Sequence, residues 1–157
     1  MASSTSVRCA QNGISVSRHE HLIDHFNGIT EAAHEISYHD NVAISAITWT
    51  EVAVKLDAAG IAEFDLLIAA LPIYVLNTDD AIVREAARLR AASIQANQHG
   101  QGRKIKTPDA IILATAHLTG RMLVTRDADD FRSIARVPLR TPYVYYGGPV
   151  TNIAAPP

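Results

Sequence analysis

Three short apolar runs, separated by segments with helical spacing, constrain the fold of this chain most strongly. The runs cover residues 42–47, 73–76 and 122–125, and they contain many β-branched residues. Short continuous apolar runs are typical of strands buried on both faces of a parallel sheet. Parallel strands need long crossover connections, which are usually helices, so the alternation predicts an α/β fold with a mostly parallel central sheet.

The segments between these runs predict helices, whose limits we place from capping residues and glycines. The clearest start is at Thr107, an expected N-cap, followed by Pro108 and by Asp109 in the first turn. This helix is apolar nearly all round, so we expect it to be buried and to end at Gly120. The other expected features are a helix capped by Thr48 or Thr50 and stopped near Gly60, a helix over 62–71 ended by Pro72, a helix opened by Thr78, and a loop over 95–106.

The chain has 157 residues, which is the size of one domain. We expect a flexible N-terminal tail over 1–13, a folded domain over 14–142, and a C-terminal edge segment and tail over 143–157 with an edge strand at Val144–Tyr146. No apolar run reaches the length of about 18 residues that a membrane span needs, and residues 1–11 lack the apolar core of a secretory signal. The lone Cys9 cannot form an internal disulfide, so the expected location is the cytoplasm.

Three acidic residues stand where strands end or helices begin. Glu51 follows the first apolar run, Asp109 lies at the start of the buried helix, and Asp127 comes two residues after the last run. Ligands bind at the carboxyl ends of parallel strands, so these carboxylates are expected to converge. Clustered oxygen ligands suit Mg²⁺ or Mn²⁺, which activate water for attack on a phosphodiester, and Thr125 is expected to support a ligand.

Each acid also has a purely structural interpretation. Asp109 and Glu51 are equally placed to complement a helix dipole, and Glu51 can be an ordinary surface acid. Asp127, Asp129 and Asp130 can form a solvated turn. A phospho-acceptor signalling domain would also gather acids at strand ends, but it needs an acidic pair after the first strand and a late lysine, and neither is clear in this sequence.

The blocks that carry these acids resemble PIN-domain toxin ribonucleases of the VapC type. The resemblance lies in Lys106–Ala116, Gly120, Leu123–Asp127 and Asp130–Phe131, and in the Ile44–Glu51 block, and it extends over about residues 22–142. It implies a three-layer α/β/α PIN-like fold. It also implies that Glu51, Asp109 and Asp127 bind Mg²⁺ or Mn²⁺ and cleave RNA, with Asp130 competing for the fourth acidic role. The partners that it implies are a cognate antitoxin and a second copy of the chain in a homodimer.

One position departs from the family's pattern. A PIN domain normally opens with a hydrophobic strand that ends in an Asp-x-Asn motif. In this chain Arg18 stands at the expected aspartate and Glu20 at the expected asparagine, after the poorly strand-like segment Ile14–Ser17. A cation there would displace a metal ion, so we expect a weakened or inactive enzyme, unless Glu20 or Asp24 takes over in a shifted register. The inactive alternative is a PIN-fold protein that acts as an antitoxin-binding module. A misassigned start would also explain the departure.

Histidines and basic residues leave further alternatives open. His19, His21 and His25 suggest zinc, although chance is the simpler explanation. His117 is expected to be packed, and Trp49 to belong to the core or to stack on a base. The basic residues could bind RNA phosphates as one patch or belong to a solvated loop: Arg103, Lys104, Lys106, Arg121 and Arg126.

Overall fold

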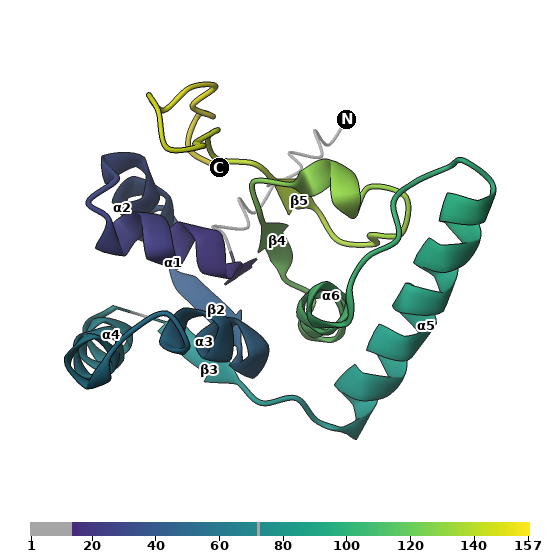
Figure 1. Ribbon diagram of the computed structural model, residues 1–157, viewed down its shortest axis with the longest axis horizontal. Coiled ribbons are helices and arrows are strands. Elements are labelled where there is room, and N and C mark those ends of the chain that lie inside the picture. The colour runs from purple at the N-terminus through teal and green to yellow at the C-terminus, as the bar shows by residue number, and fades with distance from the viewer. Residues whose placement is uncertain (1–13, 72) are drawn as a thin grey trace, which may run out of the picture.

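The computed structural model describes residues 14–71 and 73–157, which form one central sheet of five parallel strands (Figure 1). The strand order is β3-β2-β1-β4-β5, so β1 is the central strand. The expected α/β fold with a parallel sheet is confirmed, while the expected tail over 1–13 lies outside the described residues. The strands are β1 (Ile14–Ser17), β2 (Asn41–Ser45), β3 (Ile73–Leu76), β4 (Met122–Val124) and β5 (Leu139–Arg140).

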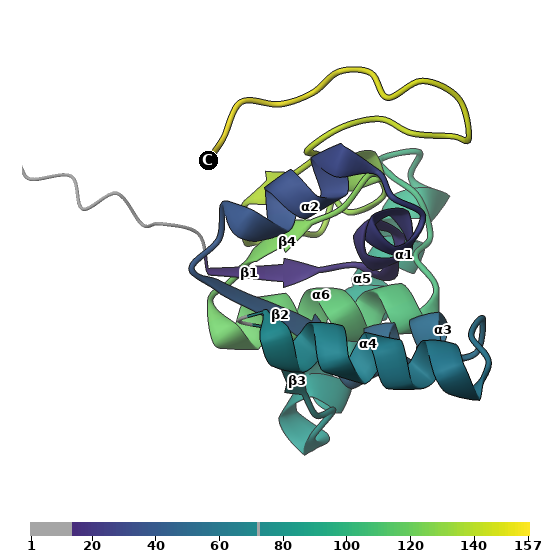
Figure 2. The same cartoon turned by 90° about the vertical axis from the view of Figure 1, so that its left-hand side faces the viewer.

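Helices cover both faces of the sheet, which gives the expected three layers. In Figure 1, α5 and α6 lie on one side, and α1, α2 and α4 lie on the other; Figure 2 shows the same arrangement turned by 90°. The helices are α1 (His19–Phe26), α2 (Thr30–Ser37), α3 (Ala46–Ala53), α4 (Ala58–Ala70), α5 (Asp80–Gln98) and α6 (Thr107–Thr119), with a short 3-10 turn η1 (Ala128–Asp130).

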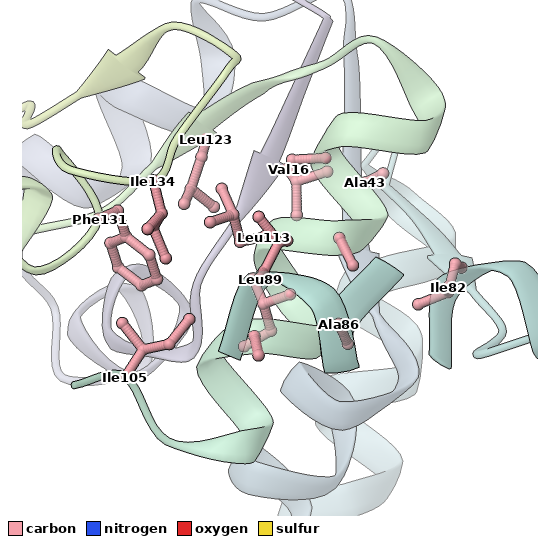
Figure 3. Close-up of a cluster of buried hydrophobic side chains, with 14 residues drawn as sticks. Val16, Ala43, Ile82, Ala86, Leu89, Ile105, Leu113, Leu123, Phe131 and Ile134 are labelled. Atoms are coloured by element: carbon pink, nitrogen blue, oxygen red, sulfur yellow. The ribbon is translucent and has the colours of Figure 1, made fainter. Parts of the chain in front are cut away.

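Two apolar clusters hold the layers together, one on each face of the sheet. Side chains alternate between faces along a strand, so Ala43 packs towards α5 and α6, whereas Val42 and Ile44 pack towards α1–α4. The first cluster also contains Leu113 of α6 and Phe131 after η1, and Figure 3 shows these side chains interlocking. Burial on both faces explains why β2 and β4 are continuous apolar runs rather than alternating ones. The expectation that 73–76 is a buried strand was wrong in part: β3 lies at the edge of the sheet, and its Tyr74 and Val75 side chains are exposed.

Several expected helix starts were wrong by a few residues, because other side chains cap the helices. Ser45 accepts a hydrogen bond from the Ile47 amide at 3.2 Å, so α3 begins before Thr48. Asp57 accepts one from the Gly60 amide at 2.8 Å, so Gly60 lies inside α4 rather than stopping a helix. Asp79, not Thr78, caps α5, which continues into the expected 95–106 loop as far as Gln98.

The ends of α6 match the sequence interpretation more closely. Its N-cap is Lys106, which makes no side-chain capping bond, so Thr107 is the first helical residue rather than the cap. Gly120 ends the helix in the left-handed conformation, at φ 63°, as expected. The helix therefore runs from Asp109, at the carboxyl edge of the sheet, back to the start of β4.

Two strand assignments also change. Ile14–Ser17, which resembles a strand poorly in sequence, is the central strand β1 and pairs with both β2 and β4. Its serines at 15 and 17 are buried, so main-chain pairing on both sides compensates for the weak apolar pattern. The expected edge strand at Val144–Tyr146 was wrong: Leu139–Arg140 is the edge strand beside β4, β3 forms the opposite edge, and Val144 makes an isolated bridge with Thr151.

Across residues 14–71 and 73–157, no helix has the length and apolar character needed to cross a membrane.

Candidate carboxylate site at the sheet edge

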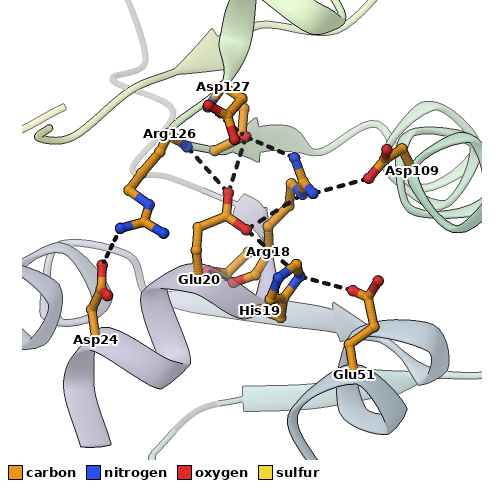
Figure 4. Close-up of polar contacts among 10 residues, drawn as sticks. Arg18, His19, Glu20, Asp24, Glu51, Asp109, Arg126 and Asp127 are labelled. Carbon is orange, nitrogen blue, oxygen red and sulfur yellow. Dashed lines mark hydrogen bonds and ion pairs between the residues drawn. The ribbon is translucent and has the colours of Figure 1, made fainter. Parts of the chain in front are cut away.

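The carboxyl ends of β1, β2 and β4 meet at one edge of the sheet, and the polar residues of the candidate site gather there (Figure 4). Arg18 follows β1 directly, Thr125 follows β4 directly, and Glu51 is on α3, which begins where β2 ends. Asp109 reaches the same edge from the first turn of α6. The parallel topology therefore brings together residues that are up to 107 positions apart in the chain.

The guanidinium of Arg18 occupies the centre of this site. Its Nη2 donates to Asp109 Oδ1 at 2.9 Å, and its Nη1 donates to Thr125 Oγ1 at 3.4 Å. Its Nε lies 3.5 Å from Glu20 Oε2, and its Cζ lies 5.4 Å from the centre of the Phe131 ring. Only 8% of Arg18 is exposed. A buried arginine keeps its charge, so this cation interacts with the surrounding acids at short range.

A second potential cation, His19, lies beside Glu51. The His19 Nδ1 atom is 2.8 Å from Glu51 Oε2 and 3.7 Å from Glu20 Oε2. Both His19 and Glu51 are partly exposed, with 22% and 28% of their side chains accessible. Thus each of the two acids expected from α3 and α6 has a basic partner supplied by the chain itself.

Glu20 links the two halves of the site. Its Oε1 accepts hydrogen bonds from the Thr125 hydroxyl and from the Arg126 amide, both at 3.2 Å. Burial alone would raise the pKa of Glu20, but the charge of Arg18, with smaller contributions from His21 and His19, holds the pKa below its ordinary value. Glu20 is therefore an ionised, buried part of the site, at the position where the family's pattern has an asparagine.

The remaining sequence-predicted residues lie towards the rim. Asp127 is exposed, and its amide donates to Thr125 Oγ1 at 3.1 Å. Asp130 accepts a hydrogen bond from Arg103 at 2.9 Å on the surface. Thr125 is buried and contacts Arg18, Glu20 and the Asp127 amide, so it fixes the relative positions of the central acids and the rim.

The side chains in this arrangement do not fit a divalent metal ion. Among the described residues, no group of three or more His, Cys, Asp or Glu side chains is arranged to hold one. Arg18 donates to the Asp109 oxygen that a metal would need, and its positive charge would repel the ion at close range. We therefore derive no catalytic step through a metal for this arrangement.

A buried polar group next to the site was missed in the sequence. Asp24 of α1 accepts hydrogen bonds from the Tyr143 hydroxyl at 2.9 Å and from Arg126 at 3.3 Å. Burial raises the pKa of Asp24 despite these partners, and burial also raises the pKa of Tyr143. Because 119 positions separate Tyr143 from Asp24, no local spacing could have indicated this contact. Arg126 thus pairs with Asp24 rather than with its neighbour Asp127.

The histidines do not form the zinc site that their spacing allowed. His21 is fully buried against the Tyr143 ring, with centroids 5.5 Å apart, and burial lowers its pKa to about 4. His117 is packed as expected: its Nδ1 lies 3.0 Å from Glu85, and its Nε2 accepts the Arg136 amide at 2.9 Å. Within the described part of the chain, no three metal-binding side chains group around these histidines.

The five basic residues do not all lie in one patch, although Arg103 and Arg126 line the same surface hollow. Arg121 precedes β4 and bonds to Asn41, whereas Arg126 follows β4 and bonds to Asp24, so the two lie at opposite ends of the strand. Arg103 is exposed and paired with Asp130. Trp49 packs beside the apolar cluster that contains Phe64, as its core interpretation predicts, and its ring nitrogen donates to Asp65.

Comparisons with known proteins identify the family. The family model described as "PIN domain" matches residues 19–137. A "Toxin-antitoxin complex from Klebsiella pneumoniae" is 32% identical, covers 82% of this chain and 98% of its own, and superposes with a TM-score of 0.65. The structure of "FitAcB from Neisseria gonorrhoeae" is 18% identical, with 82% and 97% coverage and a TM-score of 0.63. "VapBC-1 from nontypeable Haemophilus influenzae" is 19% identical, with 80% and 95% coverage and a TM-score of 0.61.

No curated protein sequence matches the chain. The family match covers most of the sheet and all six helices, and the 32% identity extends over more than two thirds of both chains. The chain therefore belongs to the PIN-domain family, and its fold is similar to that of VapBC-1.

Proposed function

We propose that this chain is the toxin-side member of a type II toxin–antitoxin pair, which binds a cognate antitoxin but lacks efficient metal-dependent cleavage of RNA. The observation that carries the proposal is the 2.9 Å hydrogen bond from buried Arg18 to Asp109, at the position where the family's pattern has an aspartate. The proposal of an antitoxin partner is supported by the 32% identical relative, which is described as a toxin–antitoxin complex.

A cleavage assay tests the catalytic part of this proposal. The purified chain is incubated with RNA and Mg²⁺ or Mn²⁺, beside Asp109→Asn and the matched surface variant Asp129→Asn, whose carboxylate contacts only exposed Arg132 among the described residues. We expect all three proteins to show the same low level of cleavage. Metal-dependent cleavage that Asp109→Asn abolishes and Asp129→Asn retains would overturn the proposal.

The second candidate is an active Mg²⁺- or Mn²⁺-dependent endoribonuclease in the cytoplasm. It would use Glu51, Asp109 and Asp127 as catalytic and metal-binding acids, with Thr125 and Asp130 in support. The convergence of Glu51 and Asp109 on the same sheet edge favours it. This function would require the guanidinium of Arg18 to leave its present position, and the same cleavage assay separates the two candidates.

Partner binding is tested separately from catalysis. Co-expression with the product of a small adjoining gene should yield a stable complex on size-exclusion chromatography, and Asp109→Asn should not change its yield. We also propose a homodimer, which light scattering on the free chain would detect as twice the monomer mass. Failure to recover any complex would contradict the antitoxin-binding role, whatever the cleavage assay gives.

A further inference from the structure

The surroundings of Arg18 form a socket that matches a guanidinium group. A carboxylate from α6 and a hydroxyl after β4 each accept from one terminal nitrogen, at 2.9 and 3.4 Å. The Phe131 ring lies under the group, with 5.4 Å between its centre and Arg18 Cζ. Planar stacking together with directed acceptors is the environment that guanidinium groups prefer. Four separate segments contribute to this socket: α1 with Glu20, α6 with Asp109, the end of β4 with Thr125, and the residue after η1, Phe131.

The negative charges of the site also favour a cation that is attached to the chain. Glu20, Glu51 and Asp109 carry three carboxylates within a single edge of the sheet, and such a group repels itself unless cations neutralise it. Arg18 lies between Glu20 and Asp109, while His19 lies beside Glu51. The guanidinium group of arginine is a cation, so Arg18 places a positive charge at the centre of the three carboxylates.

From this geometry we infer that the carboxylate edge is a guanidinium-binding site occupied by the chain's own Arg18, and that the folded protein therefore needs no divalent metal there. The inference rests on the proposed function in one respect: both require that basic side chains of this chain contact the acids of the site. It goes further by assigning the socket a ligand class. If Arg18 is truncated, the socket binds a free guanidinium ion, and if its charge is reversed, the socket binds a divalent cation.

The first arm of the test measures rescue by guanidinium. Arg18→Ala should unfold at a lower temperature than the wild-type chain, because Asp109 and Glu20 lose their shared cation. Guanidinium chloride at low millimolar concentration, below its denaturing range, should raise the melting temperature of Arg18→Ala by about 2–4 °C. Sodium chloride at equal ionic strength should not. The matched control is Arg84→Ala, which removes an exposed arginine whose partner within residues 14–71 and 73–157 is Asp80 alone, and it should show no rescue.

The second arm measures metal binding by calorimetry with manganese chloride. The wild-type chain should give no binding heat. Arg18→Asp should bind Mn²⁺ at least about tenfold more tightly than Arg18→Asn, because it adds a negative charge where Arg18 had a positive one. Arg18→Asn, which removes the charge without adding an acid, should bind less tightly than Arg18→Asp. Adding Asp109→Asn to Arg18→Asp should remove the gain.

Two results would overturn the inference. One is binding of Mn²⁺ by the wild-type chain as tight as that by Arg18→Asp. The other is an equal response of Arg18→Ala and Arg84→Ala to guanidinium. If Arg18→Asp does not fold, as judged by circular dichroism, the guanidinium arm and the wild-type titration decide alone. Both arms use the free chain without RNA or antitoxin, so their failure is distinguishable from a failure to bind an antitoxin.

Discussion

Two largely buried arginines pair with carboxylates in this fold, and they do so in different ways. Arg140 on β5 donates to both oxygens of Glu35 on α2, at 2.7 and 2.9 Å, which makes a closed bidentate pair. Arg18 makes one short hydrogen bond, to Asp109, while Thr125 and Glu20 lie at 3.4 and 3.5 Å. The Nε of Arg18 is buried and has no hydrogen-bond partner among the described residues.

The Arg140–Glu35 contact is a bidentate pair that stabilises the fold, whereas Arg18 is a cation that lies among several acids. Glu35 also contacts His39 Nε2 at 2.8 Å, so its oxygens are fully used. Burial alone would raise the pKa of Glu35, but the hydrogen bonds from His39 and Arg140 lower it to about 2. Arg18 instead contacts two acids, Asp109 at 2.9 Å and Glu20 at 3.5 Å, and neither contact is bidentate. This is expected where the ends of several strands, rather than one pair of side chains, determine where the charged groups lie.

The largest effect that would break this comparison is expected for Arg140→Ala. It leaves Glu35 buried without its bidentate partner, and removing one member of a buried pair costs about 3–5 kcal/mol of unfolding free energy. Urea denaturation measures the loss. Arg140→Lys keeps the charge but not the bidentate contact, so it should lose less unfolding free energy than Arg140→Ala. A loss below that of Asp109→Asn would show that the Arg140 pair is not the more stabilising of the two.

Acid should affect the two regions in different pH ranges. His21, next to the Arg18 site, has a pKa lowered by burial from 6.5 to about 4, so its neutral form favours folding. Its contribution, about 3 kcal/mol, is present above pH 6.5 and is lost as the pH falls through 4. Glu35 has a lowered pKa of about 2, so its contribution is present above pH 4.5 and is lost only as the pH falls towards 2.

Urea denaturation at a series of pH values would resolve these two steps. His21→Leu should remove the decrease between pH 6.5 and 4 and retain the decrease below pH 4.5. Glu35→Gln should retain the decrease between pH 6.5 and 4 and remove the decrease below pH 4.5. The groups that face His21 are Glu20, Glu35, Arg126 and Arg18, so a first step that survives in His21→Leu would have to arise from another group in the structure.

A smaller effect, but one with an informative sign, is expected for Asp109→Asn. Among the residues that the structure describes, it removes the only acceptor within 3 Å of the Arg18 guanidinium, and it should lower the unfolding free energy by about 1–3 kcal/mol. In a carboxylate cluster dominated by repulsion, the same change would increase stability. Asp127→Asn is the matched control: it is exposed, and the change should stay within about 0.5 kcal/mol. An increase in stability for Asp109→Asn would mean that Arg18 does not neutralise the site.

Sequence reasoning predicted the fold well where the signal was local. The apolar runs located β3 and β4, and Gly120 located the end of α6. It failed where a side chain outside the expected position made the cap, as Ser45 and Asp79 do. It also undervalued β1, because pairing with strands on both sides is a tertiary effect that four residues with two serines do not reveal.

The candidate site was predictable in part. Family pattern and strand topology placed Arg18 at the expected acidic position and Glu51 and Asp109 at the same edge, where the structure has them. The contact of His19 with Glu51 depends on side-chain conformations that no spacing encodes. The bond from Tyr143 to Asp24 depends on how the C-terminal segment returns to α1. Such contacts become visible only in three dimensions.

The smallest effect should come from Asp130, the acid that the sequence places in competition with Asp127. Its pair with Arg103 is exposed, with 78% of the arginine side chain accessible, so Asp130→Asn should cost about 0–1 kcal/mol of unfolding free energy. At 1 M salt the Debye length is about 3 Å, so interactions between exposed charges are largely screened. The stability cost of Asp130→Asn should therefore vanish at 1 M salt, whereas the cost of Asp109→Asn should persist. Urea denaturation at low and high salt measures both. A salt-resistant loss at Asp130 as large as that at Asp109 would extend the site beyond Thr125 to the surface turn.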